Sequence, residues 1–189
     1  MSMIGNFFAG NEEEAIDNWK KLITQALNHI NQFRRLFDSE EQYCFYQGKQ
    51  MSGCYIGLWS KKNVLSKIKD IYMSKVKTGM GGFAKNKGSV SLRFKIDETS
   101  FAFLNCHLAS GAGNINKRTD MIESILDEAF IKAKGLPKAA NHHSTFLFGD
   151  LNFRVNLDNK VARQAVVEGK LEHLLQYDEL TQLKNAAAA

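Results

Sequence analysis

The sequence predicts an α/β or α+β protein in which helices cover a β-sheet. Three observations predict this class. Apolar residues recur at helical spacing over residues 12–37, apolar and polar residues alternate over residues 89–96, and residues 101–104 and 145–148 form continuous apolar runs. Continuous runs are typical of strands covered on both faces. A helix predicted between them, over residues 117–134, gives the strand–helix–strand order of a sheet with helical layers.

The other elements follow from local signals. Asn11 caps the first helix, and three glutamates in its first turn lie where the helix dipole favours negative charge. The apolar stripe of this helix comprises Ile16, Trp19, Ile23, Ala26, Leu27, Ile30 and Phe33. Further strands are predicted over residues 43–46, 54–59 and 68–75, with turns at 48–50 and 97–100. Two last helices are predicted over residues 158–168 and 170–183.

Composition indicates a single soluble globular domain. The 189 residues are 44% hydrophobic and 24% charged, which excludes disordered and fibrous classes. The first residues lack the basic-then-apolar order of a signal peptide, and no apolar run approaches the roughly 20 residues of a membrane span. A net charge of +5 favours anionic partners such as phosphates, acidic lipid or nucleic acid. Three cysteines without a CxxC pair suit a reducing compartment, so we expect the cytosol.

The strongest chemical signal follows the apolar run 145–148. Gly149 lets the backbone approach a neighbour closely, and Asp150 comes at the end of the strand. If the chain stays extended, Asp150, Asn152 and Arg154 share one face. A carboxylate can deprotonate water, an amide can hold that water or a transferring oxygen, and arginine can bind phosphate. The alternative is a surface strand whose Asp and Asn favour a turn.

A second buried strand, residues 101–104, also ends in polar residues, Asn105 and His107, before a loop of small residues. A lone histidine at a strand end is more often structural than catalytic. Two buried strands that both end in polar residues are less ordinary, however, because sites in α/β proteins gather at strand ends. The adjacent pair His142 and His143 has no partner at ligand spacing and is predicted to lie on the surface.

Residues 78–89 form a glycine-rich segment that includes Lys85 and Lys87. The segment is neither a Walker A loop nor a dinucleotide fingerprint, because Gly-Lys-Ser/Thr is lacking and a strand follows. Exposed backbone N–H groups and lysine charge make it a candidate phosphate-binding loop. A solvated flexible turn is an equally good interpretation.

These three segments, in this order, resemble the inositol polyphosphate 5-phosphatase catalytic domain of the endonuclease/exonuclease/phosphatase superfamily. Residues 85–89 read Lys-Asn-Lys-Gly-Ser, residues 105–111 read Asn-Cys-His-Leu-Ala-Ser-Gly, and residues 146–154 read Phe-Leu-Phe-Gly-Asp-Leu-Asn-Phe-Arg. Residues 174–180, Leu-Leu-Gln-Tyr-Asp-Glu-Leu, are similar to the family's Leu-Leu-x-Tyr/Phe-Asp-Gln-Leu. Departures are Ser89 for Gly, Cys106 for Ser and Leu147 for Trp.

The resemblance implies a four-layer α/β/β/α sandwich of the DNase I-like type, here partial. It also implies Mg²⁺-dependent removal of the 5-phosphate from phosphoinositides or inositol polyphosphates. Asp150 would activate water, Asn152 would hold the water or the scissile phosphate, and His107 would stabilise the developing charge. The residues implied to bind substrate phosphates are Arg154, Lys87, Asn86 and Asn105.

The resemblance places the family's magnesium-binding Glu upstream of Met1 and its second signature downstream of Leu183. We therefore expect one partial domain over residues 1–185, no metal ligand within it, and an uninformative alanine tail at 186–189. The expected location is the cytoplasm, extending to the cytosolic face of membranes through peripheral contact with acidic lipid. No nucleic-acid partner is expected. A nuclease of the same superfamily and a catalytically silent phosphate-binding module are the alternatives.

Overall fold

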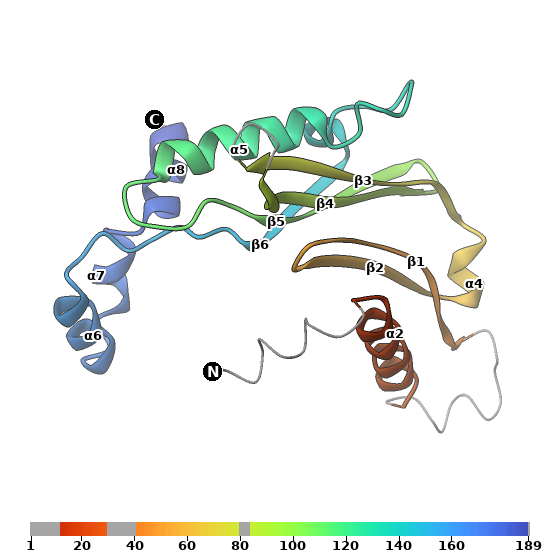
Figure 1. Cartoon of the computed structure of the whole chain (residues 1–189), viewed down its shortest axis with the longest axis horizontal. Coiled ribbons are helices and arrows are strands. Elements are labelled where there is room, and N and C mark those ends of the chain that lie inside the picture. The colour runs from red at the N-terminus through yellow and green to blue at the C-terminus, as the bar shows by residue number, and fades with distance from the viewer. Residues whose placement is uncertain (1–11, 30–40, 80–83, 189) are drawn as a thin grey trace.

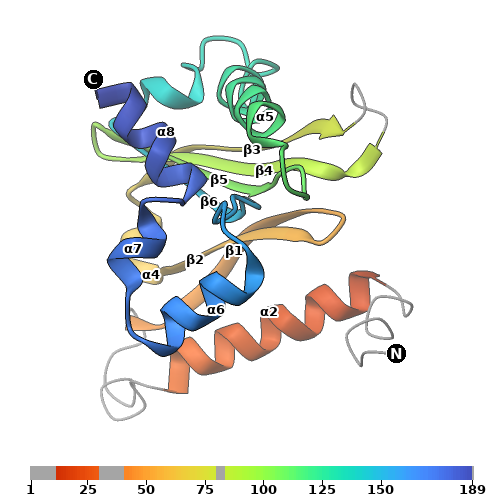
Figure 2. The same ribbon diagram turned by 90° about the vertical axis from the view of Figure 1, so that its left-hand side faces the viewer.

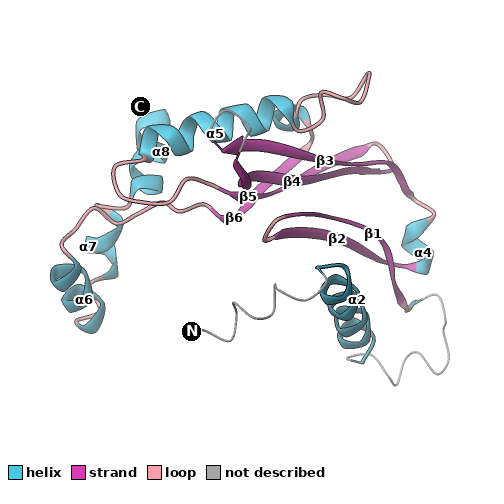
Figure 3. Cartoon of the chain, in the orientation of Figure 1, coloured by secondary structure: helices cyan, strands magenta, loops and turns pink. Residues whose placement is uncertain are grey.

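The computed structural model describes residues 12–29, 41–79 and 84–188. Four layers lie on one another in Figures 1 and 3: a helix, a four-stranded sheet, a two-stranded sheet and a second helix. The outer helices are α5 (Ile115–Glu128) and α2 (Glu12–His29). The two-stranded sheet pairs β1 (Tyr43–Met51) with β2 (Cys54–Lys61), and the short α4 (Lys62–Leu65) follows it. The α/β/β/α order predicted from the resemblance is confirmed.

The four-stranded sheet has the order β3-β4-β5-β6. Its strands are β3 (Ile68–Gly79), β4 (Ala84–Ile96), β5 (Thr99–His107) and β6 (Ser144–Asp150). The first three pair antiparallel, whereas β5 and β6 are parallel and are connected through α5 and the 3-10 turn η3 (Ala139–Asn141). A parallel pair needs such a crossover, and it brings the carboxyl ends of both strands to one edge of the sheet.

Strand alternation divides the interior into two cores. On one face of the sheet, Leu104 and Cys106 of β5 pack with Met121 and Ile125 of α5. On the other face, Val90, Leu92 and Phe94 of β4 pack with Met51, Cys54 and Ile56 of the two-stranded sheet. The strands of this sandwich therefore carry apolar side chains on both faces, which explains the runs without alternation.

Several predicted bounds differ from the structure. Residues 48–50, predicted as a turn, lie inside β1, and the chain turns at Ser52 and Gly53. The helix predicted over 117–134 ends at Glu128. The helix predicted over 170–183 is two helices, α7 (Leu171–Leu175) and α8 (Glu179–Ala188), which follow α6 (Asn159–Val167) at one end of the sandwich (Figure 2). Residues Ala186–Ala188, predicted as an uninformative tail, continue α8.

The predicted helix over residues 12–37 begins at Glu12 as expected, while Asn11 and residues 30–37 lie outside the described residues. Trp19 was placed in its apolar stripe but is 58% exposed. At 3.6 residues per turn, position 19 lies about 60° from Ile16 and so falls at the margin of the buried face. None of the helices in the described ranges is long and apolar enough to cross a membrane.

The run 145–148 was predicted to be buried, but Phe146 and Phe148 are 48% and 41% exposed. Strand β6 is an edge strand that pairs with β5 alone. The second sheet packs on β3, β4 and β5, so nothing in the described residues covers this face of β6 in the same way. Phe146 instead stacks on Phe103 of β5 at a ring-centroid distance of 4.9 Å.

His142 was predicted to lie on the surface and is instead 8% exposed. Its Nε2 accepts a hydrogen bond of 3.0 Å from Arg93 Nε, and its Nδ1–H faces the carbonyl oxygens of Lys138 and Ala139 at 3.1 Å. An imidazole that accepts at one nitrogen and donates at the other is neutral. Burial lowers the pKa of His142, and the charge of Arg93 lowers it further.

This histidine gives a prediction about acid stability. The native ring resists protonation, whereas an unfolded histidine has a pKa of about 6.5. The unfolded state therefore binds more protons below pH 6.5, and the contribution of His142 to the free energy of unfolding is lost as the pH falls through its lowered native pKa. Urea unfolding between pH 8 and 5 should show a slope from this group of at most about 1.4 kcal/mol per pH unit. His142→Gln should flatten that slope; an unchanged slope contradicts the assignment.

Candidate active site at the strand ends

Topology brings the predicted site residues together at one edge of the four-stranded sheet. His107 and Asp150 are the last residues of β5 and β6 and are register partners across the parallel pair. The antiparallel pairing of β4 places Gly88 opposite His107, so Lys87 reaches the same edge from the start of its strand. Three neighbouring strands thus supply an imidazole, a carboxylate and an ammonium to one place.

The contacts centre on His107 Nε2. Lys87 Nζ lies 2.5 Å from this atom, and Asp150 Oδ2 lies 3.5 Å from it. The donor and acceptor roles depend on which ring nitrogen carries the proton: Nε2 accepts from a charged lysine when the proton is on Nδ1, and it donates to Asp150 when the proton is on Nε2. The Asp150 side chain is 62% exposed, which leaves its oxygens accessible to water. An anion that enters here meets a lysine ammonium, and a water molecule meets a free carboxylate.

Asn105 lies under this group rather than in it. Its Nδ2 donates to the carbonyl oxygen of Tyr55 in β2 at 2.9 Å, which ties β5 to the second sheet. An added Cβ on Gly149 would lie 2.5 Å from Asn105 Oδ1 and 2.3 Å from the Cys106 carbonyl oxygen, so the glycine is required for this close approach. The Nδ2 end of Asn105 is thus engaged in holding β5 to β2. Its predicted role in phosphate binding stays a prediction.

Asn152 and Arg154 reach the site by a different path from the one predicted. The alternation of an extended chain was expected to place them on the face of Asp150, but β6 ends at Asp150 and Asn152 has a left-handed φ of 57°. Asn152 Nδ2 donates to the Leu108 carbonyl at 3.1 Å, and its Oδ1 accepts from Arg154 Nη2 at 2.9 Å. The amide therefore orients an exposed guanidinium beside the strand ends.

The glycine-rich segment is mostly strand. Lys77 pairs with Gly88 and Gly79 with Ala84, and the register shifts between these two pairs, so residues 85–87 lie in a bulge or irregularity of the β3–β4 ladder, while residues 80–83 lie outside the described residues. The β4 register gives partners to Ala84 and Gly88 but none to the three residues between them, so the predicted role of their backbone N–H groups in phosphate binding stays a prediction. The contribution of this segment is the Lys87 side chain. Asn86 lies on β4 and is exposed, with no contact that involves it in the described site.

Sequence reasoning did not find the residues of the second sheet that approach the site. Cys54 begins β2, is 8% exposed and lies within electrostatic reach of Asp150 and Lys87. Burial raises the pKa of its thiol, and the charge of Asp150 raises it further. A thiol kept protonated is a poor nucleophile, so covalent cysteine catalysis is disfavoured here.

Sequence reasoning also missed a buried ion pair beneath the loops that leave β5 and β6, between Arg118 of α5 and Glu179 of α8. The available signal was Glu179 itself, which stands where the resembling segment has glutamine.

The described residues do not by themselves fit a magnesium site. No group of three or more His, Cys, Asp or Glu side chains within them could hold a metal ion. Mg²⁺ requires several oxygen ligands. Among the described residues at the strand ends the only carboxylate is that of Asp150, and it lies beside His107, which contacts the Lys87 ammonium.

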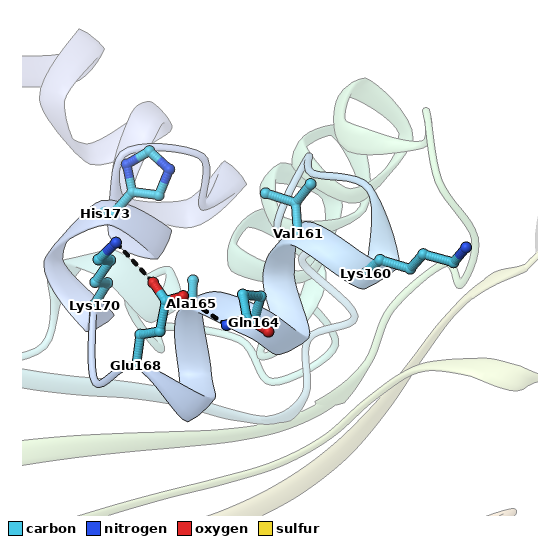
Figure 4. Close-up of a pocket in the computed structure, with 7 residues that line it drawn as sticks. All are labelled: Lys160, Val161, Gln164, Ala165, Glu168, Lys170 and His173. Carbon is cyan, nitrogen blue, oxygen red and sulfur yellow. Dashed lines mark hydrogen bonds and ion pairs between the residues drawn. The ribbon is translucent and has the colours of Figure 1, made fainter.

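A separate open hollow of about 610 Å³ lies between α6 and α7 and shares no residue with the strand-end group. Figure 4 shows its lining of Lys160, Val161, Gln164, Ala165, Glu168, Lys170 and His173. Glu168 accepts hydrogen bonds from Gln164 at 2.6 Å and pairs with Lys170 at 2.7 Å. The bond from Lys170 lowers the pKa of Glu168. Glu168 and Lys170 thus neutralise one another, which is typical of a solvated surface.

Comparison with known proteins decides the family. The family described as "Endonuclease/Exonuclease/phosphatase family 2" matches residues 4–189. The chain belongs to this family. The endonuclease/exonuclease/phosphatase resemblance read from the motifs is therefore confirmed, and so is its inositol phosphatase branch, because curated relatives of that branch match most of the chain.

Among these relatives, "Polyphosphatidylinositol phosphatase INP53" of Saccharomyces cerevisiae is 35% identical over 86% of this chain and 14% of its own length. "Phosphatidylinositol 4,5-bisphosphate 5-phosphatase A" of Homo sapiens is 29% identical over 89% of this chain and 16% of its own. A solved inositol polyphosphate 5-phosphatase domain of SpSynaptojanin, in complex with inositol (1,4)-bisphosphate and calcium ion, superposes with a TM-score of 0.76 at 25% identity. The superposition covers 92% of this chain and 48% of the solved chain.

Proposed function

We propose that this chain contributes the active-site strands of a phosphatase that removes the 5-phosphate from phosphoinositides or inositol polyphosphates. The observation that carries the proposal is the meeting of His107, Asp150 and Lys87 at the ends of three adjacent strands. The relatives that bear phosphoinositide and inositol polyphosphate phosphatase names support the substrate class.

The proposed reaction is the attack of water at phosphorus, in which the bond from phosphorus to the inositol 5-oxygen breaks. Inorganic phosphate forms, and the inositol oxygen leaves as a hydroxyl that carries the proton taken from the water. Asp150 orients and deprotonates the water, because its carboxylate is exposed and free to accept a proton. A substrate phosphate draws the Lys87 ammonium away from His107 Nε2 and is neutralised by it. Arg154, oriented by Asn152, adds a second cation. Charge neutralisation and positioning supply most of the rate in such displacements.

The proposal includes Mg²⁺ as the divalent cation. Calcium and magnesium are both hard, oxygen-seeking cations, and the calcium ion in the SpSynaptojanin domain supports a divalent requirement. The proposal also includes a cytoplasmic location with access to the cytosolic face of membranes, because a net charge of +5 favours approach to acidic lipid.

Release of inorganic phosphate from phosphatidylinositol 4,5-bisphosphate, measured with and without Mg²⁺ and beside a plasmid-nicking assay, tests the proposal. We expect Mg²⁺-dependent phosphate release and no nicking. Nicking without phosphate release would favour a nuclease. Binding of inositol phosphate without turnover at any Mg²⁺ concentration would favour a silent phosphate-binding module.

Lys87→Ala should mainly weaken substrate binding. The side chain donates a charge at the site without contributing the attacking water, so we expect KM to rise about tenfold, equivalent to about 1.4 kcal/mol, with kcat within threefold. Steady-state kinetics check this. Lys95→Ala is the matched control, because it removes the same charge from the other end of β4, where Lys95 pairs with Asp70. An equal rise in KM in the control would point to a general loss of positive potential.

A further inference from the structure

One buried ion pair ties together the two segments that leave the site strands. Arg118 of α5 is 0% exposed and Glu179, the first residue of α8, is 1% exposed. Arg118 Nη2 donates to Glu179 Oε2. The Arg118 guanidinium also lies over the Phe153 ring, 5.4 Å from its centroid.

Arg118 fixes the loop after β5. Its Nη1 donates to the carbonyl oxygens of Ala109 and Gly111, each at 3.0 Å. These residues follow His107 by two and four positions, so the guanidinium sets where the chain runs as it leaves the imidazole.

Glu179 fixes the segment after β6. Its Oε2 accepts the backbone N–H of Arg154 at 2.9 Å, and its own N–H donates to the Arg154 carbonyl at 3.0 Å. Residues 155–178 leave this point, form α6 and α7, and return through the bridge between Val155 and Asp178. Glu179 thus bonds the end of the α6–α7 segment to Arg154, the residue whose guanidinium lies at the site.

The two fixed segments also contact one another. The Leu108 N–H donates to the Asp150 carbonyl at 2.9 Å, and Asn152 Nδ2 donates to the Leu108 carbonyl. A buried ion pair is a poor source of stability, since well-packed apolar residues often do as well. Its distinctive property is directional bonding to several fixed partners, because the guanidinium is a planar fork.

The geometry points to Arg118 and Glu179 as positioning residues that hold the His107 loop and the Asp150–Arg154 segment at one separation. This inference rests on the proposed function. Neither side chain reaches the strand-end group, and both act through the backbone of residues that do. A misplacement of about 1 Å between reacting groups is enough to cost about 100-fold in rate.

The test compares Glu179→Leu with Glu179→Gln in the full 189-residue chain. Glu179→Leu removes the acceptor for both Arg118 and Arg154, whereas glutamine keeps an oxygen in its place. For Glu179→Leu we expect kcat on phosphatidylinositol 4,5-bisphosphate to fall about 100-fold with KM within threefold. We also expect hydrogen exchange at the Leu108 and Arg154 amides to quicken at least tenfold, on the scale of a lost local bond. Glu179→Gln should stay within about threefold of the parent in kcat, in KM and in the exchange rates of the two amides.

Arg93→Met is the matched control, because Arg93 is also a buried arginine with side-chain and backbone partners, toward the far end of β4. Arg93→Met should lower stability and leave kcat unchanged. If it lowers kcat as much as Glu179→Leu does, the loss of kcat follows from lost stability alone and the inference is overturned. Parent-like kcat and exchange in Glu179→Leu would also overturn it. If Glu179→Leu does not fold, Arg118→Lys takes its place, because lysine keeps the charge but lacks the planar guanidinium. The same kcat, KM and amide-exchange measurements then decide. An inactive parent would contradict the proposed function, while amide exchange would still decide the positioning role.

Discussion

Asp150→Asn is expected to lower kcat by about 10³-fold and to leave inositol phosphate binding within about threefold of the parent. General-base catalysis contributes roughly 10²–10⁴-fold, and an amide of the same shape cannot accept the proton of the attacking water. Binding should persist because Lys87 and Arg154 are unchanged and because the substitution removes a negative charge from a site for anions. Initial rates of phosphate release and calorimetric titration with inositol (1,4)-bisphosphate separate the two effects.

Asp178→Asn is a suitable control for this experiment. Asp178 caps the start of α8, accepting from the Thr181 N–H at 2.8 Å, and lies on the same return segment without contacting the strand-end group. Asparagine is also a good helix cap, so the control should match the parent in rate and in thermal stability. Parent-like turnover in Asp150→Asn would contradict the role proposed for the carboxylate.

The part of the site that the sequence predicted is the part that depends on strand ends. His107 and Asp150 each follow a strand predicted from an apolar run, and the rule that sites in α/β proteins gather at strand ends made both of them candidates. That inference needs only local patterns and one general rule. The structure brings the two side chains to 3.5 Å across a parallel pair, and it brings Lys87, a candidate from the glycine-rich segment and the resemblance, to the same edge.

The parts that the sequence did not predict depend on partners far along the chain. Arg118 and Glu179 are 61 positions apart, and Arg93 and His142 are 49 apart, so no local window contains either pair. A polar residue becomes a buried, bonded residue only through such a contact, and patterns of hydropathy assign it to the surface instead. The left-handed φ of Asn152 belongs to the same class, because its side-chain bond to Leu108 stabilises a conformation that alternation does not allow for.

Gly149→Ala is expected to destabilise the chain by roughly 3 kcal/mol or more, and to disable the site in the molecules that remain folded. Gly149 has φ of +115°, which disfavours any side chain, and an added Cβ would lie 2.3 Å from the Cys106 carbonyl oxygen. That oxygen belongs to the strand that ends in His107, so relief of the clash requires β5 and β6 to separate where their site residues meet. Urea unfolding followed by circular dichroism measures the loss.

Gly53→Ala separates this effect from the general consequence of losing a glycine. Gly53 lies in the turn between β1 and β2, its φ is not left-handed, and no atom lies within 4 Å of an added Cβ. Its free energy of unfolding should stay within about 0.5 kcal/mol of the parent. Equal stability of the two variants would mean that β5 and β6 do not approach as closely at Gly149 as the register requires, and the contact between His107 and Asp150 would lose its basis with it.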